Sequence, residues 1–138
     1  MDTAEQREPT RTLTESECWD RILAAPYGRI AVATADEIDV YPINHAVLDG
    51  AIVFRTAAGT KLLELTIQQR VAFEVDGADD AEAFSVVLKG LAEEFDRDAD
   101  TLAAERTGVT PWAPEPKDRW VRVRPTKLTG RAFAHATR

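Results

Sequence analysis

The sequence predicts a single, mainly β domain: a small β-barrel with short helices at its openings. Between residues 29 and 123 it consists largely of short runs of β-branched or alternating apolar residues, separated by Gly, Pro and Asp. An Asp-Gly pair between two such runs is a strong hairpin signal. The helical patterns are few and brief, so these observations together favour a barrel.

Length and composition set the class of protein. A chain of 138 residues with 44% apolar and 30% charged residues can bury one core without disulfides or a structural metal. Cys18 is the single cysteine, and no metal-ligand spacing occurs, so a reduced, cytoplasmic setting is expected. No apolar run approaches the roughly 18 residues of a membrane span, and the N-terminal residues are polar, so we expect neither a membrane protein nor a secreted one.

The net charge of −7 argues against nucleic acid as a partner, because an acidic surface repels phosphate backbones. The charge is unevenly distributed. From Lys117 to the end the chain carries +6, whereas the first 116 residues carry −13.

The N-terminal part predicts an arm and a helix. Residues 1–12 are polar and aperiodic, so we expect a disordered arm. Thr14 and Glu17 have the spacing of a capping box, and the helix that follows would end at Pro26. Cys18 and Ile22 share its apolar face, so Cys18 is expected to be a small core residue rather than a nucleophile.

The middle of the chain predicts strands around one short helix. Strands over 30–35 and 38–47 and the Asp49-Gly50 hairpin to 51–54 predict a three-stranded meander. A helix over 61–69, a strand over 71–75, an acidic turn over 76–80 and a long strand over 84–95 follow. Gly90 is expected to mark a kink or bulge in that strand. The turn lacks the ligand order of a calcium loop, so its acids are expected to be solvated.

The C-terminal part predicts a short helix over 98–107, an irregular Pro-rich loop over 111–116 and a last strand from Trp120 to about Val123. Basic residues alternate along this last segment. We expect them to pair with acids of the same or the partner chain, with pairs across a dimer preferred; they are Arg119, Arg122, Arg124, Lys127 and Arg131.

Two segments could hold a ligand. Arg55 and Thr56 end a strand just before Thr60 and Lys61 start a helix, so cations, hydroxyls and helical amides would converge on an anion. A solvated Lys61 with Arg55 paired to an acid is the equal alternative. In residues 41–45, Pro42 would interrupt a strand and leave backbone groups for a planar heterocycle, although a simple edge-strand proline is the favoured explanation.

These motifs, taken in order, resemble a known family. YPINHAVLDGAIVFRTAAGTKLLEL, then VAFEVDG, FSVVLKG and the terminal PWAPEPKDRWVRVRPTKLTGR, are similar to the pyridoxamine 5′-phosphate oxidase-like flavin-binding split-barrel proteins. The resemblance is closest to an actinobacterial branch that includes nitroimidazole-reductase-like proteins, and it runs from about Thr14 to Arg131. It implies a homodimer of six-stranded antiparallel, Greek-key split barrels, with one barrel over residues 13–133, a flexible tail over 134–138 and flavin mononucleotide (FMN) in the dimer groove.

The resemblance also implies site residues. The phosphate would be held by Arg55, Thr56, Thr60 and Lys61. The isoalloxazine would be lined by Tyr41, Pro42, Ile43 and Asn44. Phe84 and Ser85 would reach the flavin from the partner subunit, and Trp112 and Trp120 would close the site.

The activity that the resemblance implies is a flavin-dependent reduction of a small organic or xenobiotic acceptor. Tyr41 or His45 would deliver a proton, although a strand histidine more often makes a structural hydrogen bond. The residues that bind the substrate of a true pyridoxamine phosphate oxidase find no match, and Arg55 stands where nitroimidazole reductases often have His; both departures argue against those two activities. A deazaflavin-dependent reductase and a non-catalytic flavin- or haem-binding protein remain alternatives.

Overall fold

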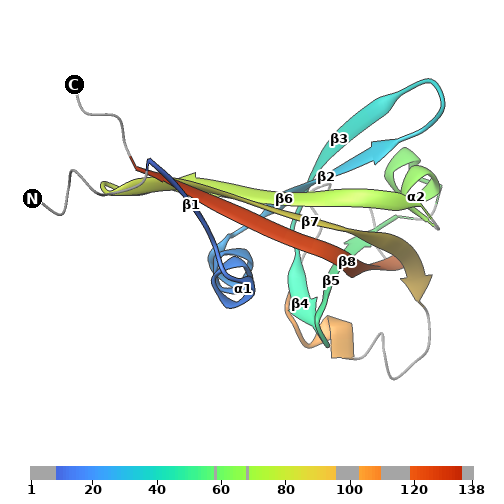
Figure 1. The fold of residues 1–138 in the computed structure, drawn as a ribbon. Coiled ribbons are helices and arrows are strands. Elements are labelled where there is room, and N and C mark those ends of the chain that lie inside the picture. The colour runs from blue at the N-terminus through green and yellow to red at the C-terminus, as the bar shows by residue number, and fades with distance from the viewer. Residues whose placement is uncertain (1–8, 58, 68, 96–102, 110–118, 135–138) are drawn as a thin grey trace, which may run out of the picture.

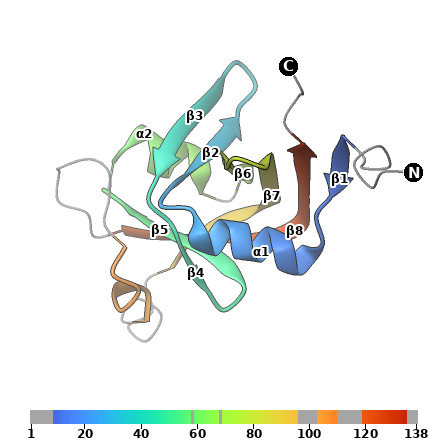
Figure 2. The ribbon, with the colours of Figure 1, turned by 90° about the vertical axis from the view of Figure 1, so that its left-hand side faces the viewer.

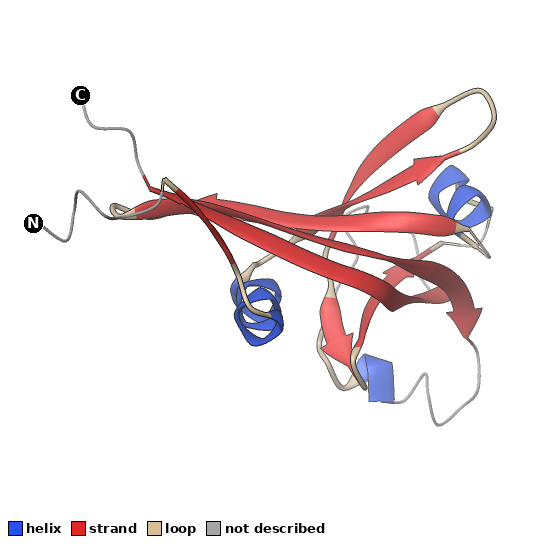
Figure 3. Cartoon of the chain, in the orientation of Figure 1, coloured by secondary structure: helices blue, strands red, loops and turns tan. Residues whose placement is uncertain are grey.

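The computed structural model describes residues 9–57, 59–67, 69–95, 103–109 and 119–134. Strands dominate it, and the helices are short (Figure 3). The strands form one antiparallel sheet that curls into a half-barrel, so the predicted fold class is confirmed (Figure 1).

Eight strands make this sheet, in the order β3-β2-β6-β7-β8-β5-β4, with β1 paired to β8. Six of them span six residues or more, while β1 and β4 have three residues each. Their bounds are β1 Thr10–Thr12, β2 Gly28–Ala33, β3 Ile38–Ile43, β4 Ala46–Leu48, β5 Ala51–Thr56, β6 Arg70–Ala78, β7 Glu82–Phe95 and β8 Arg119–Ala134. The helices are α1 (Glu15–Ala24) and α2 (Lys61–Thr66), with one further helical turn over 103–105.

The predicted meander is wrong, although its Asp49-Gly50 hairpin is confirmed. Asp49 and Gly50 both have positive φ, 51° and 72°, as a two-residue turn of type I′ requires. However, the expected strand over 38–47 breaks at Asn44-His45, and β3 and β4 lie at opposite ends of the strand order. The chain therefore crosses from one edge of the sheet to the other between these two strands.

Helix α1 closes the concave side of the sheet. Its capping box is present as predicted: Thr14 accepts a hydrogen bond from the Glu17 amide, and the Glu17 carboxylate accepts one from the Thr14 amide. Cys18 and Ile22 are buried in the main core with residues of β2 and β6, and α1 lies across the curled sheet in Figure 2. Burial raises the pKa of the Cys18 thiol, as expected of a core cysteine. Thr10–Thr12, which we expected in the arm, pair with β8.

A second, smaller core lies on the other face of the sheet. Val53, Phe95, Ala104 and Trp120 pack together there. Side chains of a strand alternate between its faces, so β5 and β8 contribute to both cores and are buried on both sides. Within the part of the chain that is described, no helix has the length and apolar character needed to cross a bilayer.

The pairing of β7 with β8 is the longest in the sheet, and it contains the predicted irregularity at Gly90. The register shifts between Lys89 and Gly90, which is a bulge. This bulge lets β8 continue past Pro125, so the strand runs to Ala134 instead of ending near Val123. A Cβ on Gly90 would lie 2.1 Å from the backbone oxygen of Arg124.

We expect Gly90→Ala to lower the free energy of unfolding by about 1–3 kcal/mol, since backbone must move to admit the methyl group. Urea denaturation measures the loss. Gly77→Ala is the matched control, because its Cβ would meet only the ring of Phe84, which can rotate away. Equal losses for the two variants would show that the bulge does not require glycine.

Candidate functional site

The turn from β5 into α2 is fixed by two threonine hydroxyls. Thr60 Oγ1 accepts a hydrogen bond from the Leu63 amide (3.2 Å) and donates one to the Ala57 carbonyl (2.9 Å). The hydroxyl of Thr56, buried at 3% exposure, is 3.0 Å from that of Thr60, whose proton is already committed, so Thr56 donates. Both hydroxyls thus shape the turn, and neither keeps a proton for a ligand.

Lys61 is the exposed cation of this turn, and it faces two acids that the sequence reasoning missed. Its ammonium lies 3.0 Å from Glu37 Oε2 and 3.7 Å from Asp39 Oδ1, at the tip and start of the β2–β3 hairpin. The hydrogen bond from Lys61 lowers the pKa of Glu37, and the same bond raises the pKa of Lys61. Both side chains are 57% exposed, so solvent screens the pair and an anion can compete for Lys61.

Asp39 adds an unsatisfied acceptor to the same place. Its Oδ2 is buried and has no hydrogen-bond partner in the described part of the chain. A buried carboxylate oxygen is costly unless a donor reaches it. Lys61 and Asp39 together therefore suit a ligand that carries both an anionic group and a hydroxyl or N–H. The sequence signal was the acidic pair Asp36-Glu37, which lies between the predicted strands over 30–35 and 38–47.

Arg55 lies apart from these groups. Strand alternation places it on the opposite face of β5 from Thr56, and its guanidinium carbon is 5.0 Å from the centre of the Trp120 ring. Trp120 is its cross-strand neighbour and is 2% exposed. Arg55 and Lys61 thus contact different neighbours and do not converge on one point. Trp120 is a core residue in a single chain, and Trp112 lies outside the described residues.

Strand β3 supplies an open edge. It pairs only with β2 among the described strands, and Pro42, opposite Arg29, sits within a continuous strand. Pro42 therefore does not interrupt β3. This agrees with the explanation favoured above, in which Pro42 is a simple edge-strand proline. Ile43 is buried, Tyr41 and Asn44 are half-buried, and Pro42 is exposed. The free edge leaves backbone groups of β3 available to a ligand.

His45 points into the protein. Its Nε2 is 2.8 Å from the Ile22 carbonyl of α1, and its ring packs edge-on against Phe73 with ring centres 4.8 Å apart. Nε2 must carry the proton, because a carbonyl only accepts. Burial, the larger effect, lowers the pKa of His45, so the neutral ring is favoured. These contacts join the β3–β4 connection to α1, and the proton-donor role of His45 stays a prediction.

Phe84 and Ser85 lie near the start of β7, at the end of the sheet opposite α2 (Figure 1). The guanidinium of Arg21 covers the Phe84 ring at 4.5 Å. The two residues cannot meet Lys61 within one chain.

Most of the basic residues of β8 pair with acidic residues of the same chain. Arg122 and Arg124 each contact Glu93 Oε1, at 2.8 and 2.6 Å, and Arg119 contacts Glu94. The preferred pairing across a dimer is therefore corrected for these three residues: their acids come from β7, the neighbouring strand.

The neutral His45 makes stability depend on pH. Folding lowers the pKa of His45, so as the pH falls the unfolded chain binds a proton before the folded chain does. The stability that the neutral ring contributes is therefore lost as the pH falls below the ordinary histidine pKa of about 6.5. We expect the stability of the wild type relative to His45→Gln to decrease between about pH 7.5 and 5.5, measured by urea denaturation. A difference that stays constant, or grows toward acid, would contradict a neutral ring.

Comparisons with known proteins agree with this architecture. A family model described as pyridoxamine 5′-phosphate oxidase matches residues 14–132. An uncharacterised protein of Mycobacterium tuberculosis is 42% identical over 82 residues, which cover 59% of this chain and 74% of that protein.

Two solved structures are similar over nearly the whole chain. The FAD binding protein from Mycobacterium smegmatis is 36% identical, with a TM-score of 0.81, over 90% of this chain and 98% of that chain. A Corynebacterium glutamicum protein named for pyridoxamine 5′-phosphate oxidase is 35% identical, with a TM-score of 0.85, over 96% of this chain and 98% of that chain. The resemblance inferred from the motifs is confirmed, and the chain belongs to the pyridoxamine 5′-phosphate oxidase family.

Proposed function

We propose that this protein is a flavin-dependent oxidoreductase that works as a homodimer and reduces a small organic acceptor. The observation that carries the proposal is the arrangement of Lys61 and Asp39 beside the open edge of β3. Family membership and the 36% identity to a FAD binding protein support flavin as the ligand. We propose FMN as the form bound here, and FAD is the alternative that the same relative raises.

Each residue of the turn would have a distinct task. Lys61 would hold the phosphate, since its pair with Glu37 is solvated and exchangeable. Thr56 and Thr60 would position Lys61 by fixing the turn, because their hydroxyl protons are used internally. Arg55 would contribute from the opposite face of β5, where its guanidinium lies over the ring of Trp120.

The open edge of β3 would orient the ring system. Backbone groups of β3 near Tyr41 and Pro42 that face away from β2 can bond the donors and acceptors of a flat heterocycle. Electron transfer is the chemistry that a bound flavin supplies. Tyr41, half-buried on this strand, is the proton donor that we favour over His45, whose proton is directed at Ile22.

The position of Phe84 and Ser85 supports the proposed homodimer. If they contact the flavin, they must come from a second chain, because β7 begins at the far end of the sheet from α2. Analytical ultracentrifugation tests this arrangement. A flavin-loaded protein that is monomeric would contradict it.

Comparing FMN with riboflavin isolates the phosphate. We expect Lys61→Ala to weaken FMN binding about tenfold and riboflavin binding little, because only FMN carries the anion. Glu37→Gln should do the reverse and strengthen FMN binding, since it removes a competitor for Lys61. Fluorescence titration measures both constants, with Arg106→Ala, an exposed cation on the 103–109 segment, as the control.

Equal losses of FMN and riboflavin on Lys61→Ala would show that this lysine does not bind the phosphate. Mass spectrometry of the cofactor released from the purified protein identifies FMN, FAD, a deazaflavin or haem. A protein that binds none of the flavins would overturn the proposal as a whole.

A further inference from the structure

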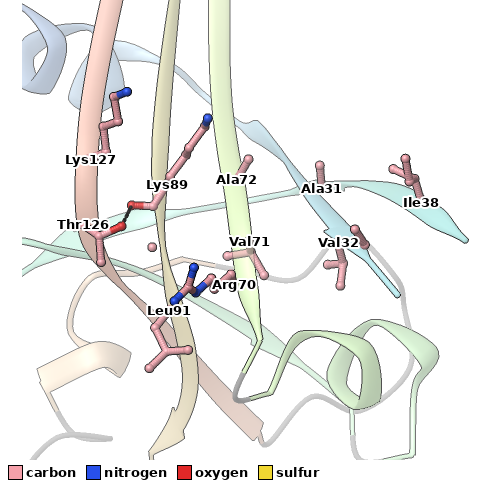
Figure 4. Close-up of a pocket in the computed structure, with 12 residues that line it drawn as sticks. Ala31, Val32, Ile38, Arg70, Val71, Ala72, Lys89, Leu91, Thr126 and Lys127 are labelled. Carbon is pink, nitrogen blue, oxygen red and sulfur yellow. Dashed lines mark hydrogen bonds between the residues drawn. The ribbon is translucent and has the colours of Figure 1, made fainter. Parts of the chain in front are cut away.

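A hollow of about 770 Å³ lies on the outer face of the sheet, which is the face turned away from α1. Figure 4 shows Lys89 and Lys127 on adjacent strands of this face. Ser85 lies on the same face as Lys89, because side chains alternate along β7. The homodimer proposed above would bring Ser85 of each chain to the open edge of β3 of the other, so this hollow would belong to the subunit interface.

A second pocket, of about 380 Å³, lies around an open edge of β6. β2 pairs with β6 from Val71 to Glu74, and beyond Glu74 no described strand pairs with β6 on that side. Residues 24–27, which lead from α1 into β2, line the pocket together with residues 75–78 of β6. Its volume is within the range of small-molecule sites.

This pocket lies next to the residues that we expect at the flavin of the other subunit. Phe84 lines it, and Asp76, which is also in its lining, is the cross-strand partner of Ser85. If Phe84 and Ser85 contact that flavin, the pocket opens beside it. A molecule bound in the pocket would then lie close to the group that donates electrons.

Arg21 is held in the wall of the pocket by two contacts. Its Nη2 donates a hydrogen bond to Glu82 Oε1 (3.1 Å), and its guanidinium carbon lies 4.5 Å from the centre of the Phe84 ring. Its Nε and Nη1 have no hydrogen-bond partner in the described part of the chain. Arg21 is therefore fixed in place and still has N–H groups to donate.

Arg29, also in the lining, is held by two acids. Its Nη1 contacts Glu74 Oε1 at 3.0 Å and Asp76 Oδ2 at 3.2 Å. Among the described residues nothing accepts a hydrogen bond from its Nε or Nη2. The pocket therefore has N–H donors from two arginines that their neighbours position.

The acids leave no surplus of positive charge for an anion. Glu82, Glu74 and Asp76 place three carboxylates on the two arginines that line the pocket. A carboxylate or phosphate would meet these acids, whereas a nitro or carbonyl oxygen accepts a hydrogen bond without adding a full charge. Two aromatic rings and several small residues make up much of the remaining lining and suit an aromatic ligand; they are Tyr27, Phe84, Ala24, Ala25, Gly77 and Ala78.

We propose that this pocket binds the electron acceptor, and that the acceptor is an uncharged aromatic compound whose nitro or carbonyl oxygens face Arg21 and Arg29. Reduction places negative charge on such oxygens, and N–H donors that are already in position stabilise that charge. The inference rests on the proposed function, and it adds a substrate class and the residues that select it.

Titration of the full chain with nitrobenzene tests the site by binding alone. FMN is present and stays oxidised, because no reductant is added. In amide NMR spectra we expect shifts at Ala24, Ala25, Gly77 and Ala78. Toluene, which lacks the oxygens, and benzoate, which has the same shape and a charge, should each bind about tenfold more weakly. The proposal is overturned if the shifts lie elsewhere, or if toluene or benzoate binds as tightly as nitrobenzene.

Arg21→Gln and Arg11→Gln are a matched pair of variants. Both arginines contact Glu82 Oε1, and only Arg21 lines the pocket. Arg21→Gln should weaken nitrobenzene binding about tenfold and toluene binding little, whereas Arg11→Gln should change neither. Circular dichroism checks that each variant is folded, and Arg29→Gln makes the same test from the other arginine. Equal effects of Arg21→Gln and Arg11→Gln would contradict the proposal.

The flavin titration separates failure of this inference from failure of the proposed function. A chain that binds FMN and does not bind nitrobenzene in this pocket would overturn the acceptor site alone. A chain that binds no flavin would overturn the proposed function, and the acceptor role with it.

Discussion

The structure depends on the long antiparallel pairing of β7 with β8. These two strands pair from Glu82 to Phe95, and both faces of that ladder are used. One face covers the main core with Val86 and Leu88, and the other carries Phe95 and Trp120 into the second core. The bulge at Gly90 is what lets so long a ladder accommodate Pro125.

Alternation along these strands also determines which charged side chains lie on the outer face of the sheet. The outward side chains of β8 run from Trp120 through Arg122 to Arg124, and the bulge then resets the register so that Lys127 faces Lys89. Glu93 pairs with both arginines, whereas neither lysine has an ion-pair partner in the described part of the chain. Lys61, at the start of α2, meets Glu37 beside β3, which is an edge strand of the sheet.

Local signals allowed much of this fold to be predicted. The capping box at Thr14, the turn at Asp49-Gly50 and the bulge at Gly90 each depend on the chemistry of a few adjacent residues, and each is present. The meander failed because strand order depends on distant pairing: β3 stops at Ile43, and His45 turns inward to α1. The end of β8 was missed because its outer half alternates polar with small residues and is held by β7.

The site was predicted less completely than the fold. Sequence motifs selected Lys61, Thr60 and the β3 segment as candidates, because short-range spacing places them on one turn and one strand. Glu37 and Asp39 were missed because only the tertiary structure brings them close to Lys61. We expected Arg55 beside Lys61. Side chains alternate between the two faces of β5, however, so Arg55 lies on the other face.

The central claim is that Lys61, beside the open edge of β3, holds the flavin phosphate. A crystal structure of the full chain with FMN tests it most directly. The account predicts the phosphate within hydrogen-bond distance of Lys61 Nζ, with the ring along Tyr41 to Asn44. A phosphate bound away from Lys61, with Lys61 still paired to Glu37, would contradict it.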